Sequence, residues 1–149
     1  MDVQIRQAGL ADAALIAPLF DQYRQFYQQP SDLPLAQTFI RDRLALLESV
    51  IFLAADDAGH VIGFTQLYPS FSSVSARRIW VLNDLFVQPS ARGKGVAHAL
   101  LDAAKLHALA AGAKRLALST AHDNPARKLY EAFGYERDEA FSHYSLELE

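Results

Sequence analysis

The stretch that most limits how this chain can fold covers residues 79–97, where an apolar segment meets a glycine-containing loop. Residues 79–87 read I-W-V-L-N-D-L-F-V, which is mostly β-branched and aromatic and predicts a buried strand. Pro89 has no backbone N–H to donate, so the strand must end before it. The loop R-G-K-G-V-A at 92–97 then leads into an Ala- and Leu-rich segment that predicts a helix.

This strand–loop–helix arrangement predicts a binding site for an anion. The first backbone N–H groups of a helix have no partner within the helix, and the helix dipole makes that end positive. Gly93 and Gly95 carry no side chain that would block a phosphate, and Arg92 and Lys94 add positive charge. The alternative interpretation is a turn before an ordinary helix.

The spacing of the loop separates three kinds of phosphate-binding motif. A Walker loop fails because the position after Gly95 is Val96, and a dinucleotide fingerprint fails because His98 stands where its third glycine belongs. The pattern R-x-x-G-x-A does fit, at Arg92, Gly95 and Ala97 after a strand ending in V-x-P. It is similar to the coenzyme A pyrophosphate loop of the GNAT superfamily, the acetyl-CoA-dependent N-acetyltransferases.

Composition excludes several classes of protein. The 149 residues suit a single domain, 1–149, and 51% hydrophobic residues can form a core. The absence of cysteine excludes disulfides, Cys-ligated zinc and thiol nucleophiles, and the net charge of −3 argues against a nucleic-acid partner. No apolar run approaches the roughly 20 residues of a membrane span, and the N-terminus lacks a signal-peptide pattern. We therefore expect a cytoplasmic protein with no membrane partner.

The periodicity of apolar residues predicts an α/β (α+β) fold: a mixed sheet of about seven strands with four helices, in the order β-α-α-β-β-β-α-β-α-β-β. This order resembles the GNAT fold over the whole chain. In that fold the strand carrying residues 83–87 splays from the next strand, and the thioester arm lies in the gap. Strands are predicted at 3–7, 50–55, 60–68, 77–87 and 116–121 with two more in 135–149, and helices at 12–27, 35–48, 95–111 and 124–133.

A second informative segment, residues 124–135, reads N-P-A-R-K-L-Y-E-A-F-G-Y. Asn124 and Gly134 suit the two ends of a helix, but the buried face of that helix does not require Tyr130. The segment is similar to the second GNAT signature, N-x-x-A-x-x-x-Y-x-x-x-G-[FY], with Ala126 one position early. In that family the Asn touches the coenzyme and the Tyr hydroxyl lies near its sulfur.

The resemblance implies an enzyme that transfers the acetyl group of acetyl-CoA to a primary amine of a small molecule, such as a polyamine or an amino acid. The transfer would be a direct attack in a ternary complex, without a metal, and the enzyme could be a homodimer. The coenzyme-binding residues that it implies are Leu85, Phe86, Val87, Arg92, Gly93, Lys94, Gly95, Val96, Ala97, Asn124, Lys128 and Tyr130.

Three residues are candidates for the chemistry. Tyr130 could protonate the leaving thiolate. Asn83 stands where many relatives carry Glu, and an amide cannot accept a proton at neutral pH. Asp84 is the nearest carboxylate, but it faces the opposite side of the strand unless a bulge intervenes. It could bind a cationic amine, act through water, or make a structural hydrogen bond. His122 is an alternative base.

Two other functions remain open at this stage. The acceptor could be an amine of a protein or peptide, which would require an open groove. The chain could also be a non-catalytic acetyl-CoA-binding module; Asn83 keeps that alternative open, and the retention of Tyr130 argues against it.

Overall fold

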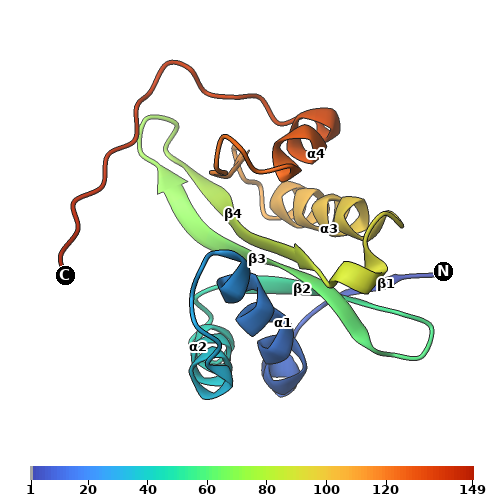
Figure 1. Cartoon of the computed structure of the whole chain (residues 1–149). Coiled ribbons are helices and arrows are strands. Elements are labelled where there is room, and N and C mark those ends of the chain that lie inside the picture. Colours follow the sequence, from blue (N-terminus) through green and yellow to red (C-terminus); the bar gives the residue numbers. More distant parts are fainter. Residues whose placement is uncertain (1) are drawn as a thin grey trace. The chain divides into compact units, whose positions relative to one another are not determined.

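The computed structural model describes residues 2–149, which form two compact units. The first unit ends at Ser119, and the second comprises Thr120–Glu149. The first holds β1 (Gln4–Gln7), the 3-10 turn η1 (Leu10–Asp12), α1 (Ala13–Phe26), α2 (Leu33–Ala45), β2 (Val50–Ala55), β3 (Val61–Ser72), β4 (Arg77–Val87), the 3-10 turn η2 (Pro89–Ala91), α3 (Val96–Ala110) and β5 (Leu116–Ala117), and the second holds α4 (Ala126–Phe133) (Figure 1).

The five strands form one sheet in the order β1-β2-β3-β4-β5. The first four are antiparallel neighbours, and β5 is parallel to β4, as the predicted strand–helix–strand unit requires. Helices α1 and α2 cover one face of this sheet and α3 covers the other (Figure 1). Every helix within residues 2–149 falls short of the length or the apolar character that a membrane-spanning helix needs.

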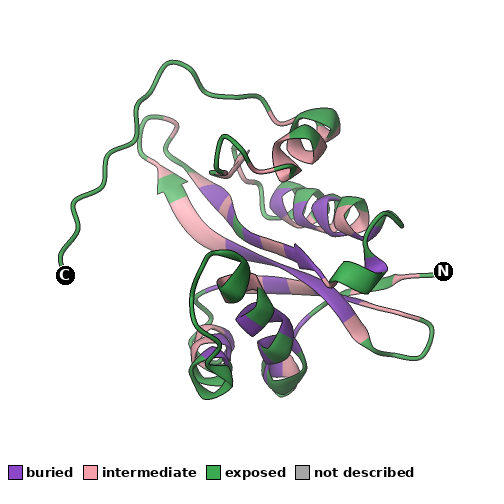
Figure 2. Ribbon diagram, viewed as in Figure 1, coloured by how far each residue is buried: buried purple, intermediate pink, exposed green. Residues whose placement is uncertain are grey.

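An apolar cluster fills each of the two layers, and burial concentrates on the central strands and the inner sides of the helices (Figure 2). The cluster under α1 and α2 contains Ile16, Phe20, Ala36, Ile40, Ile51, Leu53, Phe64 and Phe86. The cluster under α3 contains Ala54, Ile62, Val87, Ala91, Val96 and Leu100. Phe86 and Val87 are adjacent on β4 and pack in opposite clusters, because successive side chains of a strand point to opposite faces and both faces of β4 are buried here.

Most predicted elements are present, with several boundaries shifted by a few residues. The predicted helix at 35–48 begins earlier, at Leu33, because the Asp32 side chain caps it by accepting the Leu35 N–H at 3.1 Å. β3 continues past its predicted end at residue 68 and remains paired with β4 as far as Ser72. It includes Pro69, which is tolerated because β3 has only one neighbouring strand beyond its last pair with β2.

The prediction of two strands within residues 135–149 is wrong, so the sheet has five strands rather than about seven. β5 is also shorter than predicted, at two residues. The alternation of apolar and polar residues specifies which side chains share a face, but a strand forms only where another strand accepts its backbone hydrogen bonds. The apolar side chains of this segment are instead exposed: Phe141, Tyr144, Leu146 and Leu148.

Candidate functional site

The β3–β4 ladder contains one extra residue, Asn83. Gln66 lies opposite Asp84, whereas Leu67 lies opposite Leu82, so Asn83 has no counterpart on β3. This two-against-one pairing is a β-bulge, which bends the strand and redirects the side chains beyond it.

The bulge changes the face to which β4 side chains point. Before it, the ring of Trp80 lies 4.8 Å from that of His107 on α3. After it, Phe86 packs in the cluster beneath α1 and α2. Asp84 lies two residues before Phe86 and therefore faces the α1/α2 side. The sequence analysis required a bulge if Asp84 was to face the same side of the strand as the site, and that bulge is present.

Asp84 belongs to a chain of hydrogen-bonded polar side chains that crosses β2, β3 and β4. The hydroxyl of Ser49, just before β2, donates to Oε1 of Gln66 at 2.8 Å, and Nε2 of Gln66 donates to Oδ2 of Asp84 at 2.7 Å. Nδ2 of Asn83 donates to Oδ1 of Asp84, also at 2.7 Å. Gln66 is 0% exposed and Asp84 is 1% exposed. Sequence reasoning missed Ser49 and Gln66, although a glutamine within the apolar run of β3 is a signal for a buried polar contact.

The buried carboxylate of Asp84 has no cationic partner among residues 2–149, where every ion pair joins other groups. Burial raises its pKa to about 6, against the two hydrogen bonds that lower it. Burial and then the charge of Asp84 raise the pKa of Tyr68 to about 12. Tyr68 therefore stays protonated at neutral pH, while Asp84 is an anion balanced only by neutral donors.

The raised pKa of Asp84 has a measurable effect on stability. The ordinary pKa is 3.8, so the unfolded chain loses this proton first as pH rises, and the folded protein loses it near pH 6. Stability of the wild type relative to Asp84→Asn should therefore fall by about 3 kcal/mol between these values and level off above them. Urea unfolding of both proteins at pH values from about 4 to 7 measures this difference. A difference that is flat with pH, or that grows, would contradict the assignment.

The part of β4 beyond the bulge lacks a strand neighbour on one side. β5 pairs only with Trp80 and Val81, so residues 82–87 have β3 on one side and no paired strand on the other within the described chain. This is the splayed edge that the sequence resemblance implied. Three backbone carbonyl groups in this part of β4 accept hydrogen bonds from side chains. The Tyr23 hydroxyl donates to Asn83 O at 3.0 Å, Thr65 Oγ1 donates to Asp84 O at 2.8 Å, and Arg92 Nε donates to Val87 O at 2.8 Å.

The loop between η2 and α3 has the conformation that its glycines allow. Gly93 and Gly95 have φ angles of 75° and 83°, in the left-handed region that disfavours other residues. A Cβ at either position would meet no atom within 4 Å, so the space in front of both is open. Gly95 directly precedes α3, whose first residues Val96 and Ala97 present backbone N–H groups without an intrahelical partner.

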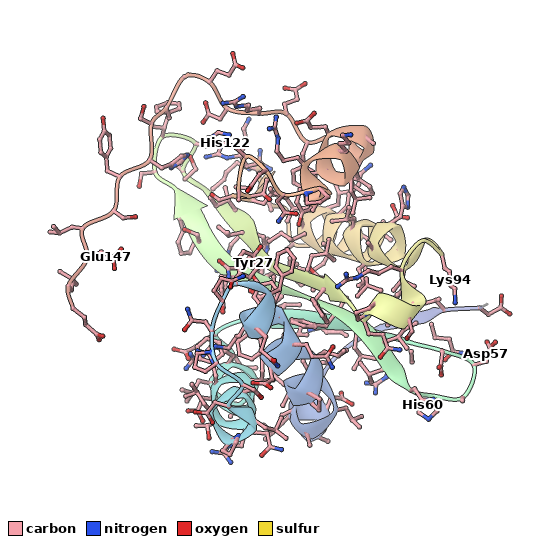
Figure 3. All side chains as sticks on the ribbon, viewed as in Figure 1. Tyr27, Asp57, His60, Lys94, His122 and Glu147 are labelled. Carbon is pink, nitrogen blue, oxygen red and sulfur yellow. The ribbon has the colours of Figure 1, made fainter. Side chains whose placement is uncertain are left out.

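The two cations of the loop are placed differently. Arg92 is anchored to β4, since its Nε donates to Val87 O and its guanidinium lies 5.3 Å from the centre of the Phe86 ring. Lys94 is exposed and projects from the loop, with Nζ 3.4 Å from the backbone oxygen of Ser90 (Figure 3). Arg92 therefore holds the loop against the strand, while Lys94 supplies a charge in solvent.

The second unit contains the other motif on α4. Asn124 was predicted as the N-cap, but the cap position is Pro125, one residue later; the Oδ1 of Asn124 still accepts the Ala126 N–H at 2.9 Å at the start of the helix. Tyr130 is half-buried, with its ring 5.9 Å from that of Tyr135, and Lys128 is exposed. His122 is exposed as well. Among residues 2–149, no group of three His, Asp or Glu side chains is arranged to hold a metal ion.

If the loop holds acetyl-CoA, as the sequence resemblance implies, Gly95→Val should weaken its binding. Valine places a branched side chain in the space before the α3 amides, and the positive φ strains it by about 1–3 kcal/mol. Gly59→Val is the matched control, because Gly59 has the same φ of 83° and equally open space in the β2–β3 turn. Both variants should lose similar stability, and only Gly95→Val should lose affinity by calorimetry. Equal affinity of two folded variants would remove the loop from the site.

Comparisons with known proteins give one consistent result. Residues 16–135 match the acetyltransferase (GNAT) family. The chain is 58% identical to the uncharacterized N-acetyltransferase YhfO of Bacillus subtilis (strain 168) over 98% of both chains. A crystal structure of a probable acetyltransferase superimposes with a TM-score of 0.93 at 44% identity, over 98% of each chain. An aminoglycoside N-acetyltransferase in complex with CoA gives 0.78 at 25% identity, over 97% of this chain and 95% of that one.

Proposed function

The chain belongs to the acetyltransferase (GNAT) family and is an acetyl-CoA-dependent N-acetyltransferase, and from that premise we propose that its acceptor is a primary amine of a cationic small molecule. Polyamines, basic amino acids and aminoglycosides are members of this class. The observation that carries the proposal is the ionised carboxylate of Asp84, buried beside the splayed edge of β4 without a cation.

An unbalanced buried anion favours a cationic ligand. Removing a carboxylate from water is costly, and two neutral amides offset only part of that cost. An ammonium group bound near Asp84 would supply the missing charge. The solved aminoglycoside N-acetyltransferase that this chain resembles supports a small polycationic acceptor.

The bound amine must lose a proton before it can attack. An alkyl amine with a pKa of ~10.4 is neutral in only about one molecule in 10³ at pH 7. Asn83 cannot take the proton, and Asp84 is too buried to touch the amine, so Asp84 accepts it through water. The neutral amine then attacks the thioester carbonyl carbon, and the C–S bond breaks. Backbone N–H groups of residues 85–87 on the unpaired side of β4 polarise the carbonyl oxygen.

The coenzyme occupies the loop and the start of α3 in this proposal. The amides of residues 93–97 bind the pyrophosphate, Lys94 adds charge, and Arg92 holds the loop in place. Leu85, Phe86 and Val87 border the thioester arm. The family motif implies that Asn124 and Lys128 also contact the coenzyme.

Tyr130 protonates the departing thiolate. A thiol has a pKa of ~8.5 and a tyrosine ~10, so the transfer is favourable only while the thiolate is poorly solvated. The hydroxyl stabilises the transition state only as charge develops on sulfur. Its loss should therefore lower kcat and leave the affinity for the coenzyme unchanged.

Tyr130→Phe should lower kcat and kcat/KM together by about 10²–10⁴-fold, with little change in acetyl-CoA affinity. Tyr135→Phe is the matched control, because it removes a buried hydroxyl from the neighbouring ring at a position where the family motif accepts Phe. Steady-state kinetics and thermal melts of both variants measure the effect. Near-normal kcat in Tyr130→Phe would leave water or His122 as the proton donor.

Asp84→Asn tests the acceptor class. The variant keeps the shape and removes the charge and the proton acceptor, so KM should rise and kcat should fall for amines that are protonated at neutral pH, and both should change less for neutral arylamines. The assay is release of free CoA thiol with a panel of both kinds of amine. Equal effects on both kinds would indicate a structural role for Asp84. Acetyl-CoA binding without turnover of any amine would favour a non-catalytic module, and turnover of peptide amines alone would favour a protein acceptor.

A further inference from the structure

The donors and acceptors of the Ser49–Gln66–Asp84–Asn83 chain have one consistent direction. An ionised carboxylate only accepts hydrogen bonds, so both flanking amides must turn their NH2 groups toward Asp84. The hydroxyl of Ser49 then donates to the opposite end of the Gln66 amide, Oε1, and fixes that orientation. Because all four side chains are engaged, none of the amides can rotate without losing a hydrogen bond.

This direction leaves the carbonyl oxygen of Asn83 turned away from Asp84. In the hydrogen bonds of residues 2–149, Asn83 uses its Nδ2 and its backbone oxygen, and Oδ1 has no donor. Asn83 is also exposed, whereas Asp84 is buried. The charge of Asp84 polarises the intervening amide and makes Oδ1 a stronger acceptor. The buried charge is thereby presented to solvent through a neutral group.

We propose that Oδ1 of Asn83 receives an N–H of the acceptor's ammonium group, and that Ser49 and Gln66 are positioning residues that hold Asp84 so that it orients the Asn83 amide. This inference rests on the cationic acceptor of the proposed function. A protonated amine is the matching ligand, because it donates N–H bonds and is attracted by the charge behind the amide. An anionic group would meet both an acceptor oxygen and the charge of Asp84.

The backbone at Asn83 is held independently of the Ser49–Gln66–Asp84–Asn83 hydrogen bonds. The Tyr23 hydroxyl on α1 donates to the backbone oxygen of Asn83, and the bulge sets its place on β4. Changes at Ser49 or Gln66 should therefore alter the orientation of the Asn83 side chain while leaving its backbone in position.

The test measures binding by calorimetry to the full chain with CoA present. The probes are benzylamine, which is protonated at neutral pH, and aniline, which is not. Asn83→Ala should weaken benzylamine binding by about 10- to 100-fold, the range for a hydrogen bond to a charged group, and should leave aniline binding unchanged. Ser49→Ala and Gln66→Met should each weaken benzylamine binding by about 2- to 10-fold. In an Asn83→Ala background neither of these two changes should have a further effect.

Thr65→Val is the matched control for a structural effect. Thr65 is as buried as its neighbour Gln66, but its hydroxyl donates to the backbone oxygen of Asp84 rather than to the carboxylate. It should lower the melting temperature and leave the benzylamine-to-aniline ratio unchanged. Equal weakening of both probes, additive effects in the Asn83→Ala background, or no preference of the wild type for benzylamine would each overturn the inference. Preserved coupling in a protein that acetylates neither probe would support the inference and count against the proposed function.

Discussion

One extra residue in β4 determines the chemistry of this face of the sheet. Without the bulge at Asn83, the alternation that begins at Trp80 would direct Asp84 toward α3, on the other side of the sheet from Gln66. With it, Asp84 and Gln66 meet as a cross-strand pair on the α1/α2 face. The bulge also puts the Asn83 oxygen within reach of the Tyr23 hydroxyl, which ties α1 to the same point.

The fold bears the cost of keeping an anion in this layer. The carboxylate of Asp84 lies beside the cluster that contains Phe64 and Phe86, where an apolar residue would pack without a desolvation penalty. Two amide donors reduce the cost but provide no counter-charge. Such an arrangement is explained more simply by the binding of a cation than by stability, because removing the charge would stabilise the fold at neutral pH.

The sequence predicted the elements that carry their own signals. β4 and the start of α3 were found because an apolar run, a proline and two glycines mark their ends. The prediction of strands after residue 135 was wrong because the alternation of apolar and polar residues does not tell whether a neighbouring strand is available for pairing. The residues Asn83 and Asp84 were identified from the sequence, but their relation was not, since a bulge depends on the register of β3 against β4. Ser49 is distant from Asp84 in sequence, and only the three-strand register brings them into one chain.

The asparagine at position 83 is better understood from its neighbour than from the glutamate that the sequence resemblance led us to expect there. A second carboxylate beside the buried Asp84 would place two like charges next to each other and raise the pKa of these groups. An amide avoids this conflict, because its NH2 group satisfies Asp84 while its oxygen still accepts a hydrogen bond from a ligand. The substitution therefore separates two tasks that one carboxylate could combine. In the proposed function, the exposed oxygen of Asn83 recognises the ammonium, and Asp84 receives its proton through water.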